Sequence, residues 1–460
     1  MTRIFDFLRT SDVPALARRN LAAELRHMAL WGCVVGSIEG PFASVVASKT
    51  FGAPELLTSL VFATPIIANL LNILWSVIIR GRPRVRTFTI LACGVLLGLS
   101  SIALNSAAWQ PWSAWLFAGQ VGLTHLFLSG LVTLRTTMWK ANYPGSHRAQ
   151  IAGRIQTLRL LLSLLTVASL SALFDRNPDL YRYVYPGVAV LGLLSLWPLR
   201  RMRMRGERAE LRRLHMHLAE RESNAAGGRG LWAGLKEAAG ILRTDRVFAA
   251  YMSAQFLLGS ANFFTDPVLV NVLTRRFDLG YSHSTLLLYQ VPTVMVLISI
   301  RFWARFFDRV GVLRFRIYNS GCWLLAFVCV TVSMAVVGWW GIEMLPVALV
   351  ILFIGRILSG TGNGGGAIAW NIGHLHFARE HQTELYMGIH VALTGLRGLL
   401  MPLAGWTANY YLGYWSFGIA LVLAGTSFML FRRMAAADDR PPRECAPDRE
   451  ELAGPRGDVT

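Results

Sequence analysis

The stretch LPVALVILFIGRILSGTGNGGGAI, residues 345–368, decides the class of this fold. It is apolar over the length of about 20 residues that a helix needs to cross about 30 Å of hydrocarbon. Its one charged residue, Arg356, lies in the middle. Charge at the centre of such a segment is costly and is usually kept for function. The stretch therefore predicts a membrane-spanning helix that carries a functional arginine.

Eleven further apolar runs of similar length make twelve in all. They cover residues 28–48, 56–79, 87–107, 114–138, 151–174, 183–199, 247–273, 282–305, 316–338, 384–407 and 413–432. Only helices and closed barrels satisfy their backbone groups in lipid. The runs lack the alternation of a barrel strand. We therefore expect an all-α membrane protein with 12 transmembrane helices.

Composition supports a membrane protein and argues against a nucleic-acid ligand. The chain has 460 residues, of which 54% are hydrophobic and 15% are charged, and its net charge is +19. The arginines and lysines are concentrated in alternate short segments between the apolar runs, so the positive-inside rule predicts that both termini are cytoplasmic. The strong bias to arginine over lysine is typical of a GC-rich bacterial genome, and no signal peptide is recognisable. We expect a multi-pass protein of the bacterial cytoplasmic (inner) membrane.

The chain divides into two similar halves. Residues 1–199 and 247–433 each hold six apolar runs, residues 200–246 form a basic central loop, and the polar, proline-rich residues 434–460 are expected to be a disordered tail. The halves repeat weakly at an offset of 230 positions: Gly81, Arg84 and Arg86 match Gly311, Arg314 and Arg316, and Leu128-Ser129-Gly130 matches Leu358-Ser359-Gly360. The central loop fits either a charged tether on the cytoplasmic leaflet or a site for anionic lipid or a partner.

The stretch ARFFDRVGVLR, residues 304–314, resembles the loop signature G-x-x-x-D-R-x-G-R-K of the major facilitator superfamily, here between the eighth and ninth runs. Asp308, Arg309, Gly311 and Arg314 carry the resemblance, while Ala304 and Val312 depart from the pattern. An acid at a helix end with basic residues beyond it can hold neighbouring helices in one of two arrangements. The expected pair is Asp308 with Arg309 or Arg314.

A second stretch, RILSGTG at residues 356–362, resembles the R-x-x-Q-G-x-G pattern of the same superfamily. That pattern is usually found in the fourth helix, whereas here it lies in the tenth, with serine in place of glutamine. The resemblance implies two pseudo-symmetric six-helix bundles (the MFS fold), transport by alternating access, and neither an enzyme activity nor a cofactor. The antiporter pattern G-x-x-x-G-P is absent from the fifth run, which counts against export.

Polar residues inside the fifth and eleventh runs predict the substrate site. Spacings of three, four and seven residues place polar side chains on one face of each helix, and transporters of this type bind substrate between their halves near the midplane. We expect a positive cavity for an anionic or zwitterionic solute; the alternative is that the arginines pair with carbonyls or an acid and stabilise the bundle. The predicted substrate-binding residues are Gln156, Arg159, Arg356, His390, Thr394 and Arg397.

Two acids inside apolar runs are candidates for proton coupling. Glu39 lies near the middle of the first run, where a carboxylate is poorly solvated and can act as a proton carrier. A structural ion pair with an arginine is the alternative. Asp266 precedes Pro267 in the seventh run and is either a gate residue that takes part in coupling or a solvated acid.

The sequence predicts a secondary transporter for a small anionic organic solute, driven by H⁺. The alternatives are an exporter of drugs or metabolites and a non-transporting membrane sensor or scaffold. We expect a monomer in the lipid bilayer without bound metal, although His374, His376 and His381 form a histidine-rich loop.

Overall fold

The computed structural model describes residues 13–71, 82–202, 239–377 and 383–437, together with a few positions at 75–79 and 204–212. Every regular element in this part of the chain is a helix. The first half contains α1 (Ala15–Gly36), α2 (Gly40–Lys49), α3 (Glu55–Ala68), α5 (Arg84–Ser101), α6 (Trp112–Asn142), α7 (Gly145–Arg176) and α8 (Tyr181–Arg200). The second half contains α11 (Arg246–Ala261), α12 (Asp266–Asn271), α13 (Tyr281–Thr285), α14 (Val291–Val310), α15 (Val312–Trp340), α16 (Leu345–Ile372), α17 (Thr383–Thr407) and α18 (Trp415–Ala436).

The helices account for all twelve predicted runs. Ten helical segments in the described residues are long and apolar enough to cross a membrane. The other two runs coincide with the shorter apolar helix Glu55–Leu71 and with the 20-residue α8. The all-helical class with twelve spans is confirmed.

The first and seventh spans are interrupted, whereas the sequence predicts continuous helices there. In the first span α1 ends at Gly36 and α2 begins at Gly40, with Glu39 as the residue that precedes α2. In the seventh, a short 3₁₀ turn at Asn262–Phe264 separates α11 from α12. A proline stands within the first two positions of both α2 and α12. Proline lacks an N–H and fits best in the first turn of a helix, so each proline favours a new start.

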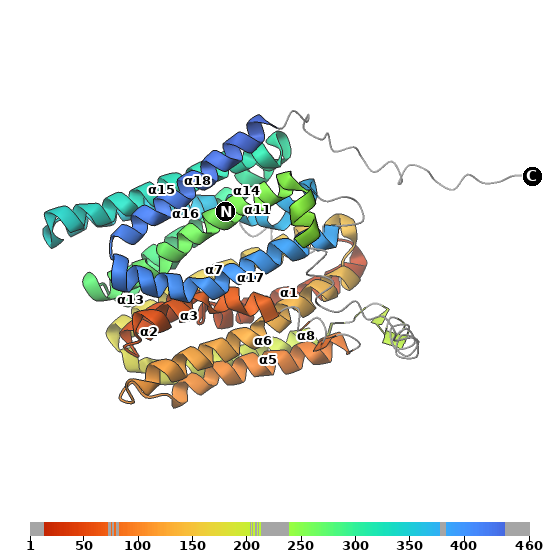
Figure 1. Ribbon diagram of the computed structural model, residues 1–460. Helices are drawn as coiled ribbons and strands as arrows, with labels where there is room; N and C mark the ends of the chain where they lie inside the picture. Colours follow the sequence, from red (N-terminus) through yellow and green to blue (C-terminus); the bar gives the residue numbers. More distant parts are fainter. Residues whose placement is uncertain are drawn as a thin grey trace, which may run out of the picture.

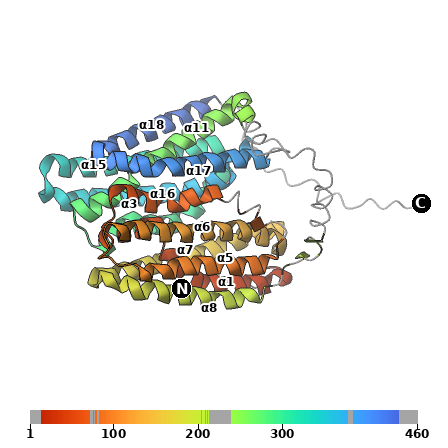
Figure 2. The same cartoon turned by 60° about the horizontal axis from the view of Figure 1, so that its bottom comes forward.

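The two halves lie side by side, with α3 and α17 along the boundary between them (Figures 1 and 2). In the first half α1 packs on α7 and α8, and in the second half α15 packs on α16 and α18. Gly395 and Gly398 of α17 leave room for Leu70 and Ile66 from the first half: an added Cβ would lie 2.1 Å and 2.7 Å from their side-chain atoms. Small residues allow the close helix approach that packing in lipid needs.

One end of the bundle, which we call the distal end, holds residues 49–55 and 272–285 and lies opposite the end of α18 (Figure 1). Buried hydroxyl pairs join the halves there: Ser48 to Thr274 at 2.9 Å, Thr50 to Tyr281 at 2.9 Å, and Ser171 to Thr285 at 2.8 Å. Ion pairs join Lys49 to Asp278 at 3.2 Å and Arg275 to Glu55 at 2.9 Å. The halves are therefore closed against each other at the distal end.

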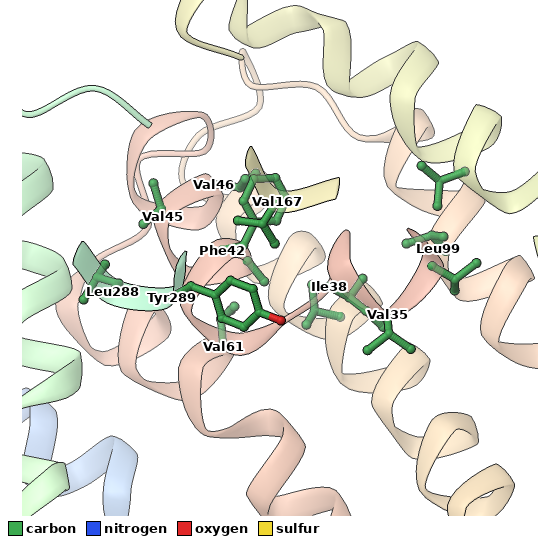
Figure 3. Packing of buried hydrophobic residues seen from close by; sticks show 14 of the residues in the cluster. Val35, Ile38, Phe42, Val45, Val46, Val61, Leu99, Val167, Leu288 and Tyr289 are labelled. Atoms are coloured by element: carbon green, nitrogen blue, oxygen red, sulfur yellow. The ribbon is translucent and has the colours of Figure 1, made fainter. Parts of the chain in front are cut away.

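Apolar packing continues this closure beside the break in the first span. Tyr289, from the second half, lies among Val35, Ile38 and Phe42 of the first half, and its hydroxyl points toward the break (Figure 3). Leu288 and Val45 belong to the same buried cluster. The break is thus surrounded by side chains from both halves.

Two predicted segments lie outside the described residues. α8 ends at Arg200 and α11 begins at Arg246, but most of the predicted central loop (213–238) and the predicted tail (438–460) are not described. The domain boundaries and the role of the loop stay predictions.

Candidate functional site

A cavity of about 300 Å³ lies in the first half, between the break in the first span and the other end of the bundle, which we call the proximal end. The proximal end is where α1 begins and α8 and α18 end. Helices α1, α6 and α7 line the cavity, with Trp31, Arg135, Trp139, Gln156 and Arg159 as its largest polar or aromatic side chains. Two of the predicted substrate residues, Gln156 and Arg159, therefore face one cavity.

Glu39 lies next to this cavity and is paired with Arg159. Nη1 of Arg159 is 3.6 Å from Oε1 of Glu39, and Nε of Arg159 donates to Oε1 of Gln156 at 2.7 Å. The hydroxyls of Ser163 and Tyr289, 2.6 Å apart, flank the carboxyl group of Glu39. The open end of α1 thus exposes an acid to an arginine in one half and to a tyrosine in the other.

Arg135, which the sequence reasoning missed, is held by its own polar network. Its Nη2 is 3.2 Å from Nε2 of His27, and Nδ1 of His27 is 3.0 Å from the carbonyl oxygen of Ser195. A carbonyl only accepts, so Nδ1 carries the proton and Nε2 accepts from Arg135. Glu24, which accepts from the indole N–H of Trp139 at 2.8 Å, supplies the nearby negative charge. The first-half cavity is therefore lined by two arginines, each of which has an acid nearby.

A second cavity, of about 270 Å³, lies in the other half. Helices α11, α15, α16 and α17 line it, with Gln255, Arg316, Trp323, Trp370 and Arg397 among its lining side chains. Asn262 and Asn363 also face this space. Both cavities therefore combine two arginines, two tryptophans and amide side chains.

The arginines of the second-half cavity differ from those of the first in having no acid. Arg316 is 1% exposed and donates to Oδ1 of Asn319 at 2.8 Å and to the side chain of Gln255. Arg397 donates from Nη1 to the carbonyl oxygen of Gln255 at 3.3 Å, while its Nε has no acceptor. Within the described residues neither guanidinium is paired with a carboxylate.

His390 adjoins a cationic cluster, which we define as Arg316 and Arg397. The His390 side chain is buried, and in the described part of the chain neither ring nitrogen has a hydrogen-bond partner. Its ring lies 5.5 Å from that of Trp370 and 6.4 Å from that of His374. Thr394, on the same helix, donates to the carbonyl oxygen of His390 at 3.0 Å. Buried donors without acceptors are costly, so the cluster is suited to receive an acceptor from a ligand.

Arg356 lies outside both cavities, and each nitrogen of its guanidinium has an acceptor. Its Nη1 is 3.1 Å from Oδ1 of Asp266, and it donates to the carbonyl oxygens of Leu287 at 2.8 Å and Leu288 at 3.2 Å. Only 6% of its surface is exposed. It therefore joins the start of α12 to the π-helical turn Leu286–Gln290, and Asp266 repeats in the second half the acid–arginine pairing of Glu39.

A sequence model described as Major Facilitator Superfamily matches residues 32–350. The chain belongs to this superfamily. This transporter also has the fold of solved members. It superposes on a D-xylose–proton symporter with a TM-score of 0.64 at 12% identity, covering 91% of this chain and 98% of that one. Nucleoside transporter NupG gives 0.62 at 14% identity, with coverages of 91% and 99%.

A POT family transporter in complex with 5-aminolevulinic acid gives a TM-score of 0.61 at 12% identity, covering 91% of this chain and 96% of that one. No curated protein sequence matches this transporter. At these identities the likeness establishes the fold and not the substrate. The protein is accordingly a multi-pass secondary transporter.

The loop motif of this transporter is exposed at the junction of α14 and α15. Gly311 adopts a φ of 73°, which only glycine adopts without strain, and separates the two helices. Asp308, Arg309 and Arg314 are exposed, and within the described residues Asp308 forms no ion pair. The predicted pairing of Asp308 with Arg309 or Arg314 is not formed in this arrangement of the halves.

The histidine-rich loop is only partly described. His374 lies beside His390, whereas His381 falls outside the described residues. Within the described residues no group of three potential metal ligands comes together.

Proposed function

We propose that this transporter moves a small organic anion by alternating access and that a proton on Glu39 drives its uptake. The observation that carries the proposal is the cationic cluster of the second-half cavity. Two guanidiniums line this cavity beside the buried imidazole of His390, and the described chain supplies no carboxylate to balance the two positive charges. A cation buried without a counter-charge is strongly disfavoured, and a bound anion would supply that charge.

The shape of the donors favours a carboxylate, sulfonate or phosphate group. Arginine presents a planar fork of N–H donors that matches these oxyanions, and such charge-assisted hydrogen bonds are stronger than neutral ones. The amides of Gln255, Asn262 and Asn363 offer further polar contacts, while Trp323 and Trp370 offer apolar area for the rest of the solute. We expect an organic anion with an apolar part to bind better than an inorganic ion.

The pairing of Glu39 with Arg159 suggests how a proton is coupled. While Glu39 is charged it attracts Arg159, so that Arg159 is less available to a second anion. A proton on Glu39 removes this attraction and frees Arg159 to contact the solute from the first half. Proton and anion then bind together, which is the requirement for symport.

Asp266 and Arg356 are proposed to act in the same cycle at the second break. Their pair joins α12 to the turn before α14, so a proton on Asp266 would loosen this junction. We propose that Glu39 links the proton to substrate binding, whereas Asp266 and Arg356 act on the closure of the distal end. Thr394 and His390 are proposed to line the solute path on α17.

The orientation follows from the positive-inside rule. We propose that the proximal end faces the cytoplasm of a bacterial cell and that the distal closure faces outward. The state described here would then be closed to the outside.

The anion site is tested by removing the charge of Arg316 and Arg397 one at a time. Candidate ligands are first found with a thermal-shift screen of organic carboxylates, sulfonates and phosphates, with neutral sugars and amines as the negative set. A hydrogen bond to a charged group contributes about 1.5–3 kcal/mol, so Arg316→Gln and Arg397→Gln should each weaken binding by roughly tenfold or more. Arg305→Gln, at an exposed position outside both cavities, is the matched control.

Two results would contradict the proposal: binding of neutral or cationic solutes alone, or unchanged affinity in both arginine variants. Flux of the same ligand in proteoliposomes separates a transporter from a sensor or scaffold, which would bind without moving solute. An exporter with proton antiport would bind its solute less well at low pH, whereas the symport proposed here requires tighter binding.

A further inference from the structure

A third cavity, of about 270 Å³, lies outside the substrate path at the proximal ends of α1 and α8. These two helices pack side by side (Figure 2). Arg19, Ala23 and Arg26 face the cavity from α1 at spacings of i, i+4 and i+7, and Trp197, Pro198 and Arg201 face it from the end of α8. The cavity is therefore built by one face of α1 and by the last turn of α8.

The cavity is cationic and is not neutralised by the protein. All three arginines are exposed, and within the described residues none of them is paired with a carboxylate. The guanidinium of Arg201 lies 4.6 Å from the ring centroid of Trp197. A cation–π contact of this kind holds the guanidinium over the ring and leaves its N–H edge available to a ligand.

The cavity adjoins a surface that faces lipid. On α8 the side chains of Val190, Leu194 and Trp197, spaced by about one turn, are 57%, 56% and 67% exposed. Exposed apolar side chains on a membrane span contact acyl chains, and tryptophan is enriched at the level of the headgroups. The first span predicted from the sequence begins at residue 28, and the sixth ends at residue 199. Arg26 and Arg201 therefore lie at the border of the hydrocarbon.

We propose that this cavity binds the phosphate of an anionic phospholipid from the leaflet at the proximal end. The arginines of α1 and Arg201 hold the phosphate oxygens, Trp197 packs against the glycerol region, and the acyl chains lie along the exposed face of α8. A free phosphate ion would match the arginines but would leave the neighbouring apolar face without a partner. The volume corresponds to several water molecules of ~30 Å³ each, which is room for a headgroup.

The proposal is independent of the transported solute, because no residue of this cavity lines either central cavity. It predicts that the protein distinguishes lipids by the charge of the headgroup. Each arginine that contacts the lipid headgroup in the cavity contributes roughly a fivefold preference for anionic lipid. Loss of all three arginines should therefore lower the preference by about a hundredfold.

The test uses the full-length protein purified in detergent and native mass spectrometry to count retained lipids. Phosphatidylglycerol and phosphatidylcholine with the same acyl chains are added separately, and inorganic phosphate is added as a competitor. The variant Arg19→Gln, Arg26→Gln, Arg201→Gln is compared with a control that removes equal charge from other exposed positions: Arg305→Gln, Arg432→Gln, Arg433→Gln.

We expect the wild type and the control to retain phosphatidylglycerol about a hundredfold more than phosphatidylcholine, and the triple variant to lose this preference. The single variants Arg19→Gln and Arg26→Gln, whose side chains are exposed, should each lose part of this lipid preference. They provide the test if the triple variant does not fold. Equal retention by wild type and the arginine variants overturns the proposal. Displacement of the lipid by millimolar inorganic phosphate would assign the cavity to a free ion and also overturn it.

Discussion

Gly259 leaves the space that the guanidinium of Arg397 occupies. A Cβ added at position 259 would lie 1.5 Å from Nη1 and 2.1 Å from Cζ of Arg397, a distance that requires the arginine to move. The glycine of α11 thus determines where the charge of α17 lies within the second-half cavity. Its role is separate from helix propensity, since alanine is the better helix former.

We predict that Gly259→Ala weakens binding of the anionic ligand about as much as Arg397→Gln, because both changes remove the guanidinium from its present place. Binding is measured by calorimetry with the ligand found in the thermal-shift screen. Gly366→Ala is the control, because Gly366 lines the same cavity and an added Cβ meets nothing within 4 Å. Normal affinity in Gly259→Ala would show that Arg397 does not act from this position.

The proton role of Glu39 makes a separate prediction. Glu39→Gln keeps the shape of the side chain but cannot exchange a proton or attract Arg159. Uptake driven by a pH gradient should fall to the level of empty liposomes, while counterflow, which needs no net proton movement, should persist. Driven uptake at the wild-type rate would remove Glu39 from the coupling mechanism.

Single residues could be predicted from the sequence only where the helix itself arranges them. The spacing of His390, Thr394 and Arg397 on one helix is local, so their common face could be predicted. Arg316 lies at the start of an apolar run, where the sequence predicts an exposed residue next to a loop. Packing of other helices leaves it only 1% exposed. The pairing of Arg356 with Asp266 joins residues 90 positions apart, which no local pattern reports.

At the scale of elements, the two broken spans have a common construction. Each has an acid at the start of its second segment, a proline in the next two positions, and an arginine as counter-charge. The sequence predicts the length and the apolar character of these spans, because hydropathy depends on composition alone. It does not predict the breaks, since proline and glycine inside a membrane helix are compatible with a continuous helix as well.

Helix packing within the second half makes a testable prediction at Gly360. An added Cβ would lie 2.5 Å from the carbonyl oxygen and 2.6 Å from Cα of Pro292. Both are backbone atoms, so the contact can be relieved only by a shift of one helix against the other. Overpacking of this kind costs about 1–3 kcal/mol. Gly360→Ala should lower the apparent Tm by several degrees in a fluorescence melt. Gly366→Ala on the same helix should not, and equal melts would show that α14 and α16 are not held at this distance.

At the scale of the whole molecule, the sequence predicts two halves of six spans, and the fold confirms this architecture. The contacts that hold the halves at the distal end come from residues with no recognisable signal. Ser48, Thr274, Ser171 and Thr285 are ordinary small polar residues in the sequence, and only the packing of the two halves makes them partners. The relative position of the halves was therefore beyond the reach of patterns along the chain.

Closure at the distal end predicts a reversible lock. The hydroxyl oxygens of Ser48 and Thr274 are 2.9 Å apart, so cysteines at both positions should form a disulfide when the distal end is closed. We expect Ser48→Cys with Thr274→Cys to stop transport under oxidising conditions and to recover with a reductant. Each single variant, which retains the native free cysteines, is the control. Full transport by the oxidised double variant, with the cross-link verified by mass, would show that this end need not open.

The polar contacts of the distal closure have an energetic consequence. A buried hydroxyl pair contributes on average only about 1 kcal/mol net, because each partner finds water when the pair separates. An equilibrium between two arrangements of the halves shifts from 1:99 to 99:1 for about 5.5 kcal/mol. A handful of such contacts is comparable with this amount, so binding of one solute and one proton can offset the polar part of the closure.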